Sequence, residues 1–266
     1  IVELASEDRP YAVFFARLSI PAILYFEAAA LSMLWAPRLD LAFMEVFRMF
    51  KVFLLYLILI NHIRDKQDLR LAVWALMGTV AFEGLIAGMQ IIKGGRLGLA
   101  FLGEAPPDPD GDSSMWRVMG TLGHPNKLAT YIESLLLLSV GMFLVEKKKI
   151  LRFVSLAIFS LGSVTLIMTG SRGAWIGFLL AFFVFIFFAL RNKTINVRAL
   201  FKPTLAALLI LVVVGVAFSD MLQERIFGDD YGSAASRIPM IKIAINIISE
   251  HPVGGVGINN YRSEEH

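Results

Sequence analysis

Seven apolar segments, each about as long as a bilayer is thick, divide this sequence between charged breaks. A helix needs roughly 20 mostly apolar residues to cross the ~30 Å hydrocarbon core of a membrane. The segments run from Leu18 to Trp35, Leu41 to Ile63, Leu71 to Ile92, Leu128 to Val145, Leu151 to Met168, Ala174 to Leu190 and Pro203 to Phe218. In lipid each backbone polar group needs a partner inside its own segment, so we expect continuous helices. The sequence therefore predicts an all-α, polytopic transmembrane helix bundle with about seven spans.

The composition supports this class of protein. Of the 266 residues, 57% are hydrophobic and 18% are charged, and the mean hydropathy is +0.68. A chain this apolar cannot cover a single core with a polar surface. It has no cysteine, which excludes disulfides, thiol nucleophiles and thiolate metal sites. The net charge of +3 is small and the basic residues are scattered, so we expect no nucleic-acid partner.

Basic residues in alternate short loops predict the orientation, because Lys and Arg collect on the cytoplasmic side. This rule leaves three segments outside: the loop 93–126, the hairpin 169–173 and the residues after Ser219. We expect residues 1–218 to form the membrane bundle and residues 219–266 to begin a large outer loop. Because the chain starts with Ile1 and stops at His266 without a closing element, we expect a fragment in which that loop is truncated.

The hairpin Thr169-Gly-Ser-Arg-Gly173 joins two predicted spans with almost no linker. Ser171 is a good N-cap for the second span, which places Arg172 in its first turn beside unpaired backbone N–H groups. With the positive end of the helix dipole, this arginine makes an anion site at the outer membrane surface. The alternative is an interfacial arginine that reaches lipid phosphate, as arginines at span ends often do.

A second arginine precedes an amphipathic helix. Pro239 suits a first helical turn, and the apolar run that follows carries a polar residue at every fourth position from Lys242 to Glu250. This pattern predicts a helix that lies on the outer membrane face and is too short to span it. Arg237, after Ser236, would point away from the polar stripe, where an arginine needs an anion. Otherwise it belongs to a frayed terminus with its side chain in water.

The stretch from Gly123 to Asn126 opens another predicted span. Asn126 is a natural N-cap, and Pro125 keeps the preceding residue extended, so a loop-to-helix entry explains this stretch structurally. The alternative role of His124 is that of a base or of a donor to phosphate.

Three carboxylates, Glu27, Glu83 and Glu133, lie within predicted spans. Ionisable groups at such depths are costly and usually face a partner or a wet cavity. We expect them to form structural ion pairs, with Arg48 and Lys51 as candidate partners.

Three short motifs lie in order on the predicted outer face. They are Gly120-Thr-Leu-Gly-His-Pro-Asn126, Thr169-Gly-Ser-Arg-Gly-Ala-Trp175, and Ser236-Arg237 leading into Glu250-His-Pro-Val-Gly-Gly-Val-Gly-Ile-Asn-Asn-Tyr261. In this order they resemble the O-antigen ligase and O-antigen polymerase superfamily. The resemblance covers roughly Leu18 to Tyr261, the middle and later part of such proteins, which carry one large periplasmic loop between two late spans.

The resemblance implies an inverting, membrane-embedded glycosyltransferase of the GT-C type in the bacterial inner membrane, with its active site on the periplasmic face. Family members move a glycan from undecaprenyl pyrophosphate to a hydroxyl of a glycan or of lipid A core, without metal, nucleotide or other cofactor. Arg172 and Arg237 match the family's two arginine positions and are implied to stabilise the pyrophosphate as catalytic residues. The implied substrate-binding residues are His124, Asn126, Ser171 and Ser236. The implied partners are this donor and acceptor, the lipid bilayer and a chain-length regulator.

Two alternatives accompany this hypothesis. First, the superfamily includes both polymerases and ligases. It also implies an acceptor-activating histidine, which we expect beyond His266.

Second, the competing class is a transporter or channel without transferase chemistry, which should show polar or Gly/Pro-broken segments at mid-membrane in repeated halves. In this sequence the special residues lie at the predicted outer surface instead.

Overall fold

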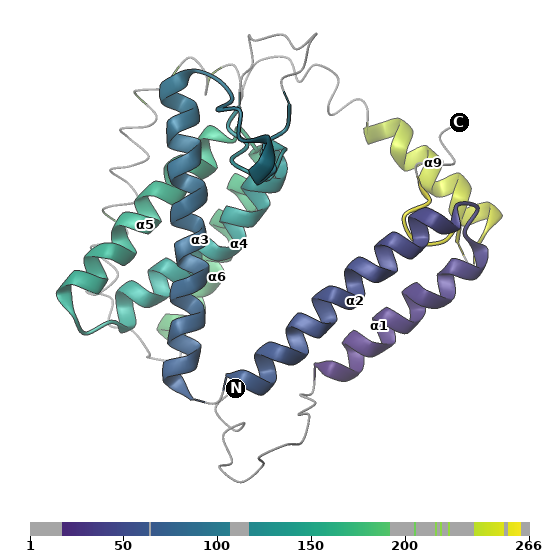
Figure 1. The fold of residues 1–266 in the computed structure, drawn as a ribbon, viewed down its shortest axis with the longest axis horizontal. Helices are drawn as coiled ribbons and strands as arrows, with labels where there is room; N and C mark the ends of the chain where they lie inside the picture. Colours follow the sequence, from purple (N-terminus) through teal and green to yellow (C-terminus); the bar gives the residue numbers. More distant parts are fainter. Residues whose placement is uncertain are drawn as a thin grey trace. The chain divides into compact units, whose positions relative to one another are not determined.

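The structure, a computed structural model, describes residues 18–63, 65–106, 117–191, 237–252 and 255–261, with single residues at 205, 216, 219 and 223. Every regular element within these ranges is a helix (Figure 1), which confirms the predicted all-α fold. The chain folds as two compact units, Ile1–Arg70 with Asp230–His266 and Leu71–Asp229. The predicted division into a membrane part, 1–218, and a loop part, 219–266, is not tested by these units and stays a prediction.

Within the part of the chain that the structure describes, four helices are long and apolar enough to cross a membrane, and they confirm a polytopic membrane protein. They are α3 (Lys66–Lys93), α4 (Pro125–Val145), α5 (Lys149–Met168) and α6 (Arg172–Arg191). The first predicted span is a shorter apolar helix, α1 (Ser19–Leu31), that continues as the 3-10 turn η2 (Ser32–Trp35). The seventh predicted span, Pro203–Phe218, lies almost wholly outside the described residues.

The second predicted span is the helix α2 (Leu39–His62), whose 24 residues would cover ~36 Å at 1.5 Å per residue. After Asp40 in its first turn, three charged residues interrupt its apolar surface: Glu45, Arg48 and Lys51. Arg48 donates to Glu45 one turn earlier, and the ammonium group of Lys51 lies 5.3 Å from the centre of the Phe47 ring. Among the described residues, Arg48 therefore forms its ion pair within its own helix and not with a carboxylate of another predicted span.

Close helix packing builds the unit Leu71–Asp229, in which α5 and α6 both pack against α4. A Cβ atom on Gly162 of α5 would lie 2.7 Å from Leu136 of α4 and 3.1 Å from Val80 of α3. Small residues at such contacts let helices approach closely, as is common between membrane spans. The larger side chains that this packing buries completely, or to within 1% exposure, include Met77, Val80, Leu128, Ile132, Leu136 and Val140.

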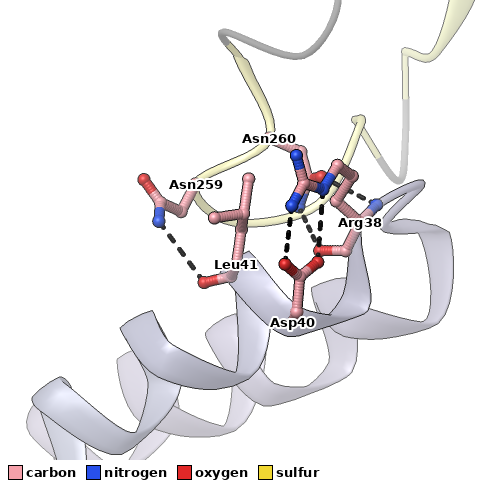
Figure 2. A network of polar contacts seen from close by, with 5 residues as sticks. All are labelled: Arg38, Asp40, Leu41, Asn259 and Asn260. Carbon is pink, nitrogen blue, oxygen red and sulfur yellow. Dashed lines mark hydrogen bonds and ion pairs between the residues drawn. The ribbon is translucent and has the colours of Figure 1, made fainter.

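In the other unit, the segment 255–261 docks on the turn between η2 and α2 (Figure 2). Asn260 is fully buried, its Oδ1 accepts from the Arg38 backbone N–H at 2.9 Å, and its Nδ2 donates to the Arg38 carbonyl at 3.3 Å. The Ile258 N–H donates to the Ser32 hydroxyl oxygen at 3.1 Å. One side-chain amide thus bonds both main-chain groups of Arg38, the N-cap of α2, whose carbonyl also accepts from the Ala42 N–H at 3.3 Å.

Two special backbone positions make this docking possible. Gly257 has a φ of 77°, and a Cβ there would lie 2.8 Å from the Ala36 Cα. Asn259 has a φ of 61°, which Asn tolerates better than most residues, and its amide donates to the Leu41 carbonyl at 3.3 Å. The hydroxyl of Tyr261 donates to a main-chain carbonyl of the helix α9 (Arg237–Glu250). The segment therefore ties α9 to the start of α2.

Replacing Asn260 with Ala should loosen this docking. The substitution leaves the Arg38 N–H without its partner, whereas the Arg38 carbonyl keeps the helical hydrogen bond from the Ala42 N–H. A buried unsatisfied group costs about 1–3 kcal/mol. Hydrogen exchange of the full-length protein should therefore show at least ~5-fold faster exchange of the Arg38 amide, the equivalent of about 1 kcal/mol of local stability. Asn259→Gly is the matched control, because it keeps the positive φ and removes only an exposed hydrogen bond. Equal protection of Arg38 in both variants would contradict the anchoring role.

Candidate functional site

The hairpin between α5 and α6 takes only three residues. α5 ends at Met168, and α6 begins at Arg172. Gly170 adopts a left-handed φ of 60°, and its N–H donates at 2.9 Å to a carbonyl of the last turn of α5. The buried hydroxyl of Thr169 donates to another such carbonyl at 2.6 Å and accepts from the Ser171 N–H at 3.3 Å. The Thr-Gly-Ser sequence therefore forms a tight turn held by its own polar atoms.

Ser171 and Arg172 lie where the sequence predicts them. Ser171 directly precedes α6, and its carbonyl accepts the helical hydrogen bond from the Trp175 N–H at 3.1 Å. The indole N–H of Trp175 donates to the Leu166 carbonyl at 2.9 Å, which fixes the start of α6 to the end of α5. Arg172, half-buried, is the first residue of this 20-residue helix. Its charge adds to a helix end whose unpaired N–H groups and dipole already favour anions.

At the start of α4, the predicted N-cap is wrong by two residues. His124 is the N-cap, with an extended φ of −154°, and its ring Nδ1 accepts from the Asn126 N–H at 3.1 Å. Pro125 keeps His124 extended and, as the first helical residue, has no N–H that needs a partner. Asn126 therefore lies in the first turn, with an exposed side chain.

Arg117 connects the start of α4 to the hairpin between α5 and α6. Its Nε donates to the Thr169 carbonyl, and its Nη2 donates to the Asn126 side-chain oxygen at 2.8 Å. The predicted outer loop and the hairpin thus meet at one end of this unit. Sequence analysis did not single out Arg117. The available signal was an arginine placed three residues before the Gly120–Asn126 motif.

Buried side chains of α3 hold the turn that follows Arg117. The Glu83 carboxylate accepts from the Thr121 N–H at 2.9 Å and from the Thr121 hydroxyl. The Gln90 side-chain oxygen accepts from the N–H groups of Met119 at 3.2 Å and Gly120 at 3.1 Å. Gly120 has a φ of 55°, and a Cβ there would lie 2.1 Å from a Glu83 oxygen, so only glycine fits. Glu83, expected to form an ion pair, instead anchors the loop through hydrogen bonds.

Glu104 organises the first part of the same loop, beside the 3-10 turn η3 (Ala100–Leu102). Its buried carboxylate accepts from the N–H groups of Leu97 at 2.9 Å, Gly98 at 2.7 Å and Leu99 at 2.7 Å, and from the Gln90 amide at 2.6 Å. Burial alone would raise the pKa of Glu104, but these hydrogen bonds outweigh it and hold the pKa below its usual range. The ionised carboxylate therefore fixes the loop at neutral pH.

The third intramembrane carboxylate packs against a glycine. A Cβ on Gly177 of α6 would lie 2.0 Å from the Glu133 Oε1 of α4. Gly177 therefore makes room for a carboxylate between two helices that begin at the same end of the unit. Within the described ranges Glu133 forms no ion pair, contrary to expectation.

Arg237 is the first residue of α9, and this confirms the predicted helix and its start. The polar residues Lys242 and Glu250 are exposed, as the amphipathic pattern predicts. Ser236 and the side chain of Arg237 lie outside the described residues. Because α9 belongs to the other unit, the prediction that Arg237 joins Arg172 at one site stays a prediction.

Burial and nearby positive charges keep His124 neutral at the end of the unit where α4 and α6 begin. Partial burial lowers the pKa of its imidazole, and the positive charges of Arg117 and Lys127 lower it further. A neutral ring leaves Nδ1 free of a proton, as its cap hydrogen bond requires, and places the proton on Nε2. The end of the unit where α4 and α6 begin thus carries three cationic side chains, those of Arg117, Lys127 and Arg172. The neutral imidazole of His124, a hydrogen-bond donor through Nε2, lies at the same end.

Comparison with known protein families gives a match to the second part of the chain. The family model Wzy_C, described as O-antigen ligase, matches residues 156–266, which include the Thr169–Trp175 hairpin and α9. No curated protein matches the chain, and no solved structure does.

The His124 cap should depend on pH. Because the folded-state pKa is lowered, the unfolded chain, with an ordinary value of 6.5, takes up the proton first. The cap's contribution to stability is therefore fully present above about pH 6.5 and is lost as the pH falls through the lowered pKa. The protection factor of the Asn126 amide should fall between pH 8 and pH 5. His124→Asn, which keeps a cap acceptor that does not titrate, should remove this dependence. A wild-type protection factor that is constant over this range would exclude the cap's titration.

Proposed function

We propose that this protein, whose residues 156–266 match the O-antigen ligase family model, is a glycosyltransferase of the bacterial inner membrane. It moves a glycan from undecaprenyl pyrophosphate to a hydroxyl of a second glycan or of lipid A core, on the periplasmic face. A chain-length regulator is a further partner in this proposal.

The proposed reaction inverts the sugar carbon. The acceptor hydroxyl oxygen attacks the anomeric carbon from the face opposite the pyrophosphate and forms the new glycosidic bond. The bond between the anomeric carbon and the phosphate oxygen breaks, and undecaprenyl pyrophosphate leaves with the bonding electrons. The hydroxyl proton passes to a general base. Negative charge grows on the leaving oxygen, so groups that stabilise it there accelerate the reaction.

The observation that carries this proposal is the cationic end of the unit at which α4 and α6 begin. Arg172 is the first residue of α6, and Lys127 lies in the first turn of α4. Arg117 joins the start of α4 to the hairpin that precedes α6. Such an end suits a multiply charged phosphate, because backbone N–H groups and fixed cations both favour it. An arginine grips phosphate oxygens through two parallel hydrogen bonds, which a lysine cannot do.

In the proposed site Arg172 and Arg237 bind the pyrophosphate as a pair of cations at two helix starts. Ser171 and Ser236, each directly before one arginine, offer hydroxyl donors to the same group. His124 Nε2–H and the Asn126 amide are further donors at the start of α4. These groups supply the charge stabilisation, and the proposal includes no metal ion and no cofactor.

Arg172→Lys and Arg237→Lys test the arginine pair. Each change keeps the charge but loses the second hydrogen bond and the planar fit. Removing one well-placed donor in an active site costs about 3–4 kcal/mol, or roughly 100- to 1000-fold, so each Lys variant should lose at least ~10-fold in transfer from lipid-linked oligosaccharide. The melting temperature of the full-length protein should change little, because a charge at a helix start contributes only about 1 kcal/mol.

Arg191→Lys is the matched control, since Arg191 is the exposed last residue of α6, at the end opposite Arg172. Its activity should equal that of the wild type. Full activity in both test variants would identify the two arginines as membrane anchors and contradict the proposal. Loss at Arg172 alone would keep the hairpin site and give α9 a structural role.

A further inference from the structure

Arg117 lies where three elements of the outer end meet, and no motif of the sequence includes it. The half-buried guanidinium donates through Nε to the Thr169 carbonyl and through Nη2, at 2.8 Å, to the Asn126 Oδ1. Thr169 is the C-cap of α5, and Asn126 is in the first turn of α4. One side chain of the loop therefore holds two helix ends.

The contact with Thr169 fixes the hairpin. The last carbonyls of a helix have no intrahelical partner and carry the negative end of its dipole, so a guanidinium is a strong partner for them. The Thr169 carbonyl shares a peptide plane with the Gly170 N–H, and Gly170 has the left-handed φ that turns the chain toward α6. Holding this plane sets the direction in which Ser171 and Arg172 leave the turn.

The contact with Asn126 orients an amide. A guanidinium has only donors, so the atom that faces it must be the Asn126 oxygen. The Asn126 NH₂ group therefore points away from Arg117, on a side chain that is exposed. The Asn126 backbone N–H is engaged by His124 at 3.1 Å, so both the main chain and the side chain of this residue are held.

We propose that Arg117 is a positioning residue. It holds the hairpin that carries Arg172 at a fixed distance from Asn126, so that the Arg172 guanidinium and the Asn126 NH₂ group donate to the same anionic group. For its catalytic consequence this inference rests on the proposed function. Its geometric content is independent of that function, since it concerns contacts within the chain.

Kinetics provide the first test. Arg117→Lys keeps the charge but cannot span both acceptors, and a misplacement of ~1 Å at a reacting centre can cost about 100-fold in rate. We expect kcat to fall at least ~10-fold, with a smaller change in KM for the donor. Arg96→Lys is the control, since Arg96 is in the same loop and also donates to a backbone carbonyl, that of Ala105, at 3.4 Å. An unchanged kcat for Arg117→Lys, or an equal loss for Arg96→Lys, would overturn the inference.

A double-mutant cycle separates positioning from an independent contribution. If Arg117 acts partly through Asn126, the kcat loss from Arg117→Lys should be several-fold smaller in an Asn126→Ala background, because coupled residues are not additive. The same fold-loss in both backgrounds would show that Arg117 does not act through Asn126.

A distance measurement tests the geometry even if the protein has no transferase activity. The chain has no cysteine, so spin labels can be attached to Lys127→Cys and Gly173→Cys, two exposed positions on the two helix starts. We expect a narrow distance distribution with Arg117 present, a broader one with Arg117→Ala and no change with Arg96→Ala. An unchanged distribution in Arg117→Ala would refute the positioning role. A broadened distribution in Arg117→Ala, together with no transfer from lipid-linked donors by the unlabelled wild-type protein, would instead refute the proposed function alone.

Discussion

Backbone polar groups among apolar side chains need hydrogen-bond partners, and this requirement shapes both units. The long helices satisfy it internally, as any segment in lipid must. The turns between helices cannot, so buried side chains serve them: Glu83, Gln90 and Glu104 bind the loop that precedes α4. In the other unit Asn260 does the same for Arg38. An unpaired group at these places would cost about 1–3 kcal/mol.

The candidate site follows from these anchored turns. Glu83 and Gln90 of α3 bind the turn at Gly120. This turn keeps Arg117 close to the hairpin and to the start of α4. The unpaired N–H groups of two long helices then lie at the same end of the unit as three cationic side chains. The chemistry proposed for this end depends on fixed positive charge, and fixed charge stabilises a growing anion without rearrangement during the reaction.

The sequence was informative where a local rule decides the structure. Apolar length predicted α3 to α6 to within a few residues, and the short linker with Ser171 predicted both the hairpin and the place of Arg172. Local rules failed where two of them compete. Asn126 is the stronger N-cap residue, but the helix begins at Pro125, the residue before it, and His124 is therefore the N-cap.

Long-range contacts were not predictable in this way. Glu83 and Thr121 are 38 positions apart, and Arg117 and Thr169 are 52 apart, so no periodicity or spacing connects them. The intramembrane glutamates were expected to need cations. The Glu83 carboxylate instead accepts hydrogen bonds from the N–H and the hydroxyl of Thr121 in the loop. Glu133 lies beside Gly177.

The central claim is that arginines at helix starts stabilise the leaving pyrophosphate in place of a metal ion. Transfer by the purified full-length protein from undecaprenyl-pyrophosphate-linked oligosaccharide, measured with excess EDTA and with added magnesium, tests it most directly. If the arginines stabilise the leaving group, the rate of transfer is the same with EDTA and with magnesium, and Arg172→Lys lowers the rate in both conditions. Loss of transfer in EDTA that magnesium restores would contradict it.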